Sequence, residues 1–208
     1  MEADTLDQVR RIFLALDYVG VLIFAVTGAL VAARKRQDLV TCMFFAGMTG
    51  MGGGTVRDLL IGAPVFWVGH GWFVAVCVAA AIAVWVLRTE QWPGKPLRWL
   101  DAMGMSAYCA FGSLKALSFG IDPVPAAVMG VITSVFGGVL RDAVAGHPSV
   151  LMQREVYVTA AIVGAGVTVL GATLGLSGLA AGLLGGGIAL GIRAGAIIRG
   201  WKLPIHPG

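Results

Sequence analysis

The chain has 208 residues, of which 58% are hydrophobic and only 12% charged, and its mean hydropathy is +0.86. A soluble domain carries roughly 25% charged residues, so this composition excludes an ordinary soluble protein. The apolar residues also occur in blocks of about 20, the length that crosses a bilayer as a helix. The sequence therefore predicts an all-α protein embedded in a lipid bilayer.

The formal net charge of +4 does not indicate a nucleic-acid partner, because Lys and Arg in a membrane protein mainly report topology. The three cysteines, Cys42, Cys77 and Cys109, are isolated in apolar runs and fit neither a disulfide framework nor a metal site. The histidines lie in predicted loops or the tail and form no catalytic pattern. We expect no enzyme, no metal and no bound cofactor.

Apolar blocks between polar or proline-rich breaks predict seven transmembrane helices, at residues 13–33, 39–62, 66–87, 100–118, 123–146, 156–174 and 178–198. Together they form one transmembrane domain over residues 1–208. Nine Lys and Arg residues flank one side of these helices, and only Arg10 and Arg11 flank the other. The positive-inside rule then predicts a multi-pass protein of the cell inner membrane, with its N-terminus outside and its C-terminus in the cytoplasm.

An internal repeat divides the chain. A shift of 84 residues aligns residues 16–64 with 100–148 without a gap and gives 15 identities in 49 positions. Repeat one spans about 13–87, repeat two spans about 100–174, and the helix at about 178–198 lies outside the duplication. Each repeat holds three helices, so the second enters the membrane from the opposite side. This predicts an inverted three-plus-three repeat plus a seventh helix, an architecture common in transport proteins.

The strongest shared motif is a glycine cluster followed by Arg-Asp, "GGGTVRD" in the second predicted helix and "GGVLRD" in the fifth. Glycine weakens a helix, and broken backbone at membrane depth survives only beside protein or a water-filled path. We therefore predict that both helices are broken or bent beside a pore. The predicted pore hinges are Gly52, Gly53, Gly54, Gly137 and Gly138. Close helix packing is the alternative.

Charges inside the predicted spans extend this hypothesis. Adjacent residues on a helix do not face one another, so Arg57-Asp58 and Arg141-Asp142 need other partners. Topology places Asp17 near Arg57 at the outer face and Asp101 near Arg141 at the cytoplasmic face. We predict Asp17–Arg57 and Asp101–Arg141 pairs, as gates or as static braces. Either way, Arg57, Asp58, Arg141 and Asp142 are candidate pore-lining or gating residues.

Hydroxyl groups precede both glycine clusters. Thr49, Thr133 and Ser134 lie about one turn before them, where they can bond a backbone carbonyl of the preceding turn or solvate a passing ion. Lys115 has no lysine counterpart in repeat one, where Val31 occupies its place, and is expected to extend toward the membrane surface.

With its seven spans, inverted repeat and doubled motif, the chain resembles the bacterial branch of the TRIC family, the trimeric intracellular cation channels. The resemblance covers nearly the whole chain. It implies a homotrimer with one pore per protomer, lined mainly by the second and fifth helices and bent at the glycines. It also implies passage of monovalent cations, chiefly potassium and sodium.

Animal members carry a Lys-Glu-Val motif on the fifth helix that contacts a phosphoinositide lipid. The corresponding region here reads "GGVLRDAV" and lacks that motif, although Arg141 is a candidate contact for an anionic lipid head group. Two alternatives to a cation channel stay open. One is a transporter of a small solute such as glycine, a substrate associated with some bacterial relatives. The other is a membrane scaffold whose charges only lock the bundle.

Overall fold

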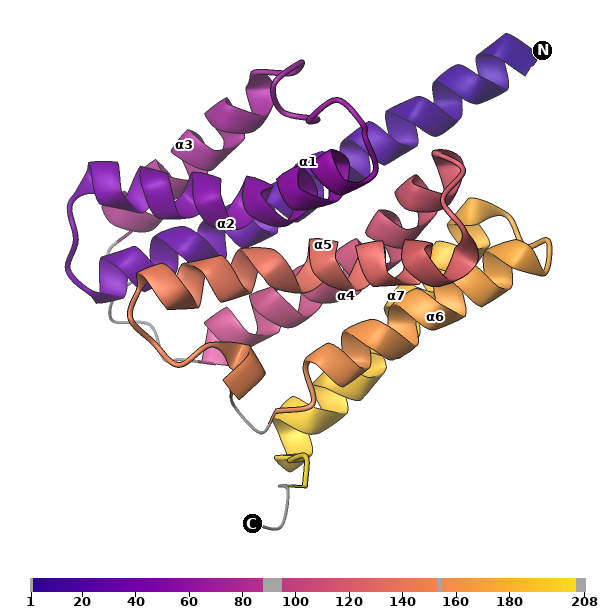
Figure 1. The fold of residues 1–208 in the computed structure, drawn as a ribbon. Coiled ribbons are helices and arrows are strands. Elements are labelled where there is room, and N and C mark those ends of the chain that lie inside the picture. Colours follow the sequence, from indigo (N-terminus) through magenta and orange to yellow (C-terminus); the bar gives the residue numbers. More distant parts are fainter. Residues whose placement is uncertain (1, 88–94, 153–154, 205–208) are drawn as a thin grey trace.

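A computed structural model describes residues 2–87, 95–152 and 155–204, and this part of the chain contains seven α-helices (Figure 1). They are α1 (Glu2–Arg34), α2 (Leu39–Leu60), α3 (Trp72–Val86), α4 (Lys95–Ser118), α5 (Pro123–Val144), α6 (Val158–Thr173) and α7 (Gly178–Arg199). A short 3₁₀ helix, η2 (Val150–Met152), follows α5. The predicted all-α class and the number of helices are confirmed.

Three predicted helix starts differ from the structure by five residues or more, and the sixth helix begins at Val158 rather than at residue 156. The first helix begins at Glu2 rather than at residue 13, and the fourth begins at Lys95 rather than at residue 100. The third begins at Trp72 rather than at residue 66. Residues 61–71 form a loop although they include the apolar run "APVFWV", because that loop packs against buried polar groups of α2.

The backbone repeats at the same 84-residue spacing as the sequence. Gly62 and Gly146, just beyond the ends of α2 and α5, both have φ of +68°. Arg36 and Gly120, in the turns that precede these two helices, also have positive φ. Hydrogen bonds repeat too: Ala63 N–H donates to the carbonyl of Asp58 at 2.8 Å, and His147 N–H donates to that of Asp142 at 2.9 Å. The structure thus shows that the two halves share one local conformation.

The start of α2 differs from the start of α5. The carboxylate of Asp38 caps α2 by accepting the backbone N–H of Thr41 at 2.7 Å, and this hydrogen bond lowers the pKa of Asp38 below its ordinary value. Its repeat partner Asp122 occupies the N-cap of α5 without a side-chain hydrogen bond, and Pro123 supplies the first helical residue there.

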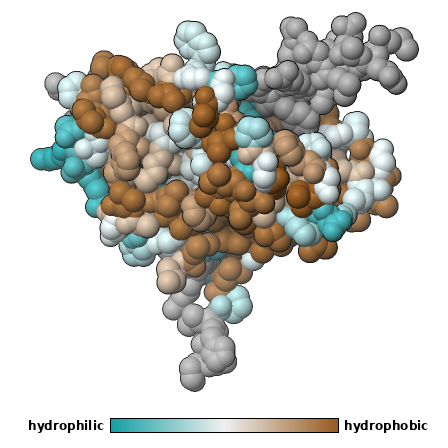
Figure 2. All heavy atoms as spheres, turned by 45° about the horizontal axis from the view of Figure 1, so that its top comes forward, coloured by the Kyte–Doolittle hydropathy of each residue, from teal (hydrophilic) through white to brown (hydrophobic). Residues whose placement is uncertain are grey.

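In the described part of the chain, four helical segments are long and apolar enough to cross a membrane: the stretch Asp17–Arg34 within α1, and all of α2, α5 and α7. The helices α3 and α6 are apolar but shorter. Brown, hydrophobic residues cover most of the face seen in Figure 2, and hydrophilic residues gather mainly near its edges. Leucines that would be costly to expose to water, such as Leu179 and Leu183, lie on the outside. The protein is therefore a multi-pass membrane protein with a lipid-facing exterior.

The helices pack as two groups joined along α2 and α5. In repeat one, α1 packs against α2 and α3; in the second half, α4 packs against α5, α6 and α7. Each group has its own apolar core. The helix pair α2 and α5 also packs together, and this contact brings the two copies of the shared motif into the middle of the protein (Figure 1).

Candidate functional site: two buried charge clusters flanking a helix crossing

The helices α2 and α5 cross with their backbones in contact at two glycines. A Cβ added to Gly53 would lie 2.2 Å from the carbonyl oxygen of Thr133, and one added to Gly137 would lie 2.4 Å from that of Thr49. Both distances are well below any ordinary contact, so only glycine fits at either position. The two contacts are related by the repeat, because Gly53 corresponds to Gly137 and Thr49 to Thr133.

The glycines do not interrupt the helices. The helix α2 runs unbroken through Gly52, Gly53 and Gly54, and α5 runs unbroken through Gly137 and Gly138. The prediction of glycine-broken helices is therefore wrong, because neighbouring protein packs closely enough to retain both helices. Close packing, the alternative, holds for Gly53 and Gly137. Their role as pore hinges stays a prediction.

The hydroxyl groups near the crossing are buried. Two of them bond a backbone carbonyl of the preceding turn, which is one of the two predicted roles. Thr133 Oγ1 donates to the carbonyl of Met129 at 2.5 Å, and Ser134 Oγ donates to that of Val131 at 2.9 Å. The hydroxyl of Thr49 is buried and has no hydrogen-bond partner in the described part of the chain. Thr49 is thus the hydroxyl of this set that is free to bind another group.

Near the C-terminal end of α5, the residues around Arg141 form what we call the inner cluster. Arg141 Nη1 donates to Asp101 Oδ1 at 2.9 Å and to Thr27 Oγ1 at 3.2 Å, and its Nε donates to Asp142 Oδ1 at 2.9 Å. Arg141 is only 4% exposed, and both carboxylates are buried. The structure contains the Asp101–Arg141 ion pair that topology predicted, which joins α4 to α5, and the hydrogen bond to Thr27 joins Arg141 to α1 as well.

At the opposite end of the crossing, the residues around Arg57 form the outer cluster. Arg57 is fully buried, and its Nε donates to Asp58 Oδ1 at 2.9 Å. Lys115 Nζ from α4 lies 2.9 Å from the same oxygen, and the backbone N–H of Phe66 donates to Asp58 Oδ2 at 3.0 Å. The carboxylate of Asp17 lies nearby and is buried.

Three expectations about these charges need correction. Asp17 and Arg57 form no ion pair within 4.0 Å among the described residues, unlike Asp101 and Arg141. Both arginines do bind the adjacent aspartate, because a long side chain can curl far enough for its Nε to reach the neighbouring carboxylate. Lys115 turns inward to Asp58 rather than extending toward the membrane surface.

Differences between the repeats explain why the outer pair does not form. The position of Thr27, which bonds Arg141, is occupied in repeat two by Phe111, and the ring of Phe111 lies 5.2 Å from Cζ of Arg57. The position of Lys115 is occupied in repeat one by Val31. At these two positions the outer cluster therefore contains a cation and an aromatic ring where the inner cluster has Val31 and Thr27.

Sequence reasoning missed a third charged group. Arg193, in the middle of the apolar α7, forms a short ion pair with Glu155 and lies 5.0 Å from the ring centre of Tyr157. Arg98 also pairs with Glu155, at 3.4 Å. An arginine inside an apolar span was the available signal, since such a residue needs a partner in the bundle. This group ties α7, which lies outside the repeat, to the start of α6.

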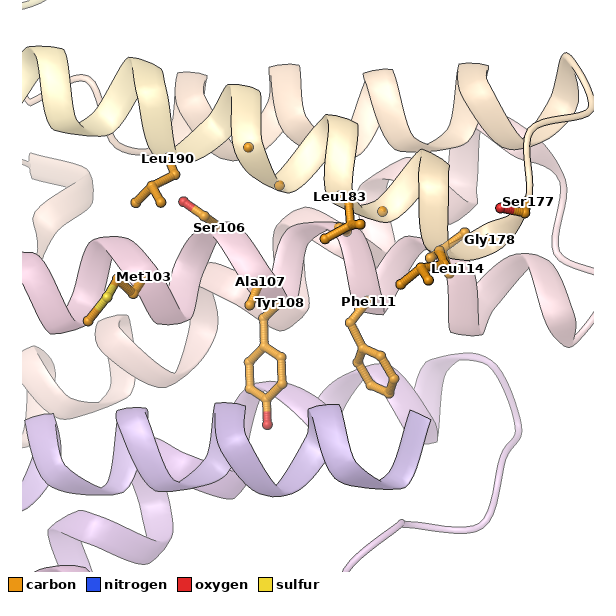
Figure 3. A pocket seen from close by; sticks show the side chains of 15 residues that line it. Met103, Ser106, Ala107, Tyr108, Phe111, Leu114, Ser177, Gly178, Leu183 and Leu190 are labelled. Carbon is orange, nitrogen blue, oxygen red and sulfur yellow. The ribbon is translucent and has the colours of Figure 1, made fainter. Parts of the chain in front are cut away.

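A groove of about 550 Å³ between α4 and α7 lies apart from the charges (Figure 3). Apolar and small residues line most of it, among them Met103, Leu114, Leu183 and Leu190. Tyr108 and Phe111 extend from α4 away from α7, toward the helices of repeat one (Figure 3). These two aromatic residues separate the groove from the outer cluster.

Comparison with known proteins agrees with this architecture. A family model described as glycine transporter matches residues 14–89 and again residues 98–173, two ranges that begin 84 residues apart. A membrane protein of Vibrio cholerae named UPF0126 is 35% identical over 193 residues, covering 91% of this chain and 80% of the relative. The inner membrane protein YadS of Escherichia coli is 36% identical over 152 residues, covering 72% and 73%.

Solved structures give the same result. The TRIC trimeric intracellular cation channel orthologue from Rhodobacter sphaeroides superposes with a TM-score of 0.86 at 39% identity, covering 91% of this chain and 99% of that one. A second TRIC cation channel superposes with a TM-score of 0.82 at 29% identity, covering 93% and 97%. The chain therefore belongs to the family that the glycine transporter model describes and to the bacterial branch of the TRIC family, and the resemblance seen in the sequence is confirmed. These neighbours are channels and not enzymes.

Proposed function

We propose that this protein is a homotrimeric channel for monovalent cations, chiefly potassium and sodium, with one pore in each protomer between α2 and α5. The observation that carries the proposal is the pair of buried charge clusters at the two ends of the α2–α5 crossing. Ionised groups inside a membrane are costly and mark ion pathways in most proteins that contain them. The similarity to solved TRIC cation channels supports the same conclusion.

The charges of the inner cluster favour cations. Asp101 and Asp142 share one arginine, so the formal charge of the three side chains is −1. In the outer cluster, Arg57 and Lys115 balance Asp58 and Asp17. An arginine alone would raise the barrier to a cation, and these carboxylates offset it. Thr49, with its unpartnered hydroxyl, supplies a neutral ligand between the two clusters.

Single-channel recording tests the channel. Purified protein in planar bilayers should give discrete openings in potassium and in sodium chloride, with reversal potentials that report cation over anion selectivity. Replacing both Gly53 and Gly54 by leucine should reduce the current, since the larger side chains force α2 away from α5 and from Phe66 and so distort the pore wall. Normal currents from a folded double variant would remove α2 from the pore. A particle of three times 21.5 kDa, measured by light scattering, tests the trimer.

The second candidate function is a transporter of a small solute, which the match to the glycine transporter family model favours. Saturable uptake of radiolabelled glycine into proteoliposomes, without discrete openings in bilayers, would favour it over the channel. Under either function, we propose that the protein lies in the inner membrane with its N-terminus outside and its C-terminus in the cytoplasm.

A further inference from the structure

The two charge clusters provide an internal comparison, because the same three residue types occupy equivalent places in each. In the inner cluster, Arg141 binds both Asp101 and Asp142. In the outer cluster, Arg57 binds only Asp58, through Nε. Its Nη1 and Nη2 atoms are buried and have no hydrogen-bond partner in the described part of the chain. The outer cluster thus holds a buried guanidinium with two donor groups unused.

The acid that corresponds to Asp101 is Asp17, and it forms no ion pair with Arg57. Asp17 is 7% exposed, and none of its described neighbours forms an ion pair with it within 4.0 Å. It nevertheless lies close enough to Arg57, Lys115 and Asp58 to interact with them electrostatically. The equivalent residues Asp101 and Arg141 are in contact at 2.9 Å. A separated acid and base therefore stand in the outer cluster where the inner cluster has a closed pair.

The chemistry of the guanidinium of Arg57 and the carboxylate of Asp17 defines the ligand. The planar fork of a guanidinium matches the two oxygens of a carboxylate, and a buried carboxylate matches an ammonium group. A simple anion would pair with Arg57 alone, and a simple cation would pair with Asp17 alone. A molecule that carries a carboxylate and an ammonium group on the same carbon pairs with both residues at once. This is the structure of an α-amino acid.

Aromatic residues restrict the size of that ligand. The ring centres of Phe111 and Phe66 lie 5.2 Å and 6.0 Å from Cζ of Arg57. Tyr108 donates its hydroxyl to the backbone carbonyl of Asp17 at 3.1 Å. Arg57 and Asp58 have no exposed surface, so the site is closed in this structure, and the loop that carries Phe66 is hydrogen-bonded to Asp58 on one side of it. Little space is left for a side chain on the ligand.

We propose that the outer cluster is a binding site for a small zwitterionic amino acid, with the ligand carboxylate on Arg57 and the ligand ammonium group on Asp17. Lys115 remains on Asp58 and keeps that carboxylate from capturing the ammonium group. The inference deepens the second candidate function, on which it rests, and assigns it a site at one end of the crossing.

Equilibrium binding of radiolabelled glycine to the purified protein in nanodiscs tests the site. Unlabelled glycine and L-alanine should displace the label, whereas acetate and methylamine at the same concentrations should not, because each carries only one of the two charges. Displacement by acetate equal to that by glycine would reduce the site to an anion site and overturn the proposal. The absence of saturable binding would also overturn it. This competition series requires no variant.

Two variants then locate the site. Arg57→Gln and Asp17→Asn should each weaken glycine binding by about tenfold or more, since each removes a charged hydrogen-bond partner. The matched control is Arg98→Gln, which changes an exposed arginine at the cytoplasmic end of α4 and should bind glycine as the unmodified protein does. Undiminished binding by either cluster variant, when it is folded by size-exclusion chromatography, would overturn the assignment.

Bilayer recording of the same preparation separates this proposal from the channel. Cation currents without glycine binding would overturn the amino-acid site and leave the channel intact. Glycine binding without currents would support the site and overturn the channel.

Discussion

The α2–α5 crossing makes a sharp prediction about alanine substitutions. In Gly137→Ala, the new Cβ would lie 2.4 Å from the carbonyl oxygen of Thr49, and in Gly53→Ala it would lie 2.2 Å from that of Thr133. Side chains cannot relieve either contact, because the obstructing atom belongs to the backbone, and the helices must separate by more than half an ångström. Gly138→Ala is the matched control, since its new Cβ would have no heavy atom nearer than 3.5 Å.

The magnitudes follow from packing and helix propensity. Overpacking a core costs about 1–3 kcal/mol, whereas replacing a helical glycine by alanine gains up to about 1 kcal/mol. Gly137→Ala should therefore lose about 1–2 kcal/mol, which lowers the melting temperature of a domain this size by about 2–8 °C. Gly138→Ala should melt at or above the temperature of the unmodified protein. Tryptophan fluorescence during heating in detergent measures both. Equal melting temperatures would refute the close approach of the two helices.

Three further predictions concern the charges and the topology. Arg141→Ala removes the cation that the buried carboxylates of Asp101 and Asp142 share and should cost about 3–5 kcal/mol, partly recovered by adding Asp101→Ala. Arg57→Ala should cost less because Lys115 still pairs with Asp58, and equal thermal shifts would contradict this. Asp38→Ala should lower the melting temperature at pH 7 more than Asp122→Ala does, because only Asp38 caps its helix. The pKa of Asp38 is lowered in the folded state, so this difference is complete above the ordinary aspartate pKa of 3.8 and should vanish as the pH falls through the pKa of Asp38 in the folded protein. A difference in melting temperature that persists in acid would exclude the charged cap. Single cysteines introduced at positions 34–38 and near the C-terminus should react with a membrane-impermeant reagent only from the cytoplasm, and one near residue 4 only from outside; labelling of all from one face would refute the orientation.

Much of the fold could be predicted from the sequence, because the length and hydropathy of a segment identify a membrane helix. The repeat then showed which helices of the two halves correspond to one another. The ion pair between Asp101 and Arg141 followed from topology alone. The predicted pair between Asp17 and Arg57 does not form, and the reason lies in another helix. Phe111 and Lys115 of α4 contact Arg57 and Asp58 of α2, and the sequence of α2 alone does not show these contacts. Hydropathy also misplaced the start of α3, since an apolar loop resembles an apolar helix until its hydrogen bonds are known.

Gly53 contacts Thr133 and Gly137 contacts Thr49, so α2 and α5 touch through their backbones where they cross, like two rods joined at one point. The two symmetric backbone contacts fix the spacing of the helices at their centre, so a relative movement that keeps these contacts is a rotation about the crossing. A larger crossing angle then separates the helices at both faces of the membrane, so the two clusters widen or narrow together. Spin labels on exposed residues near the helix ends would follow this motion as parallel changes in two distances, one between positions 60 and 124 and the other between positions 40 and 144.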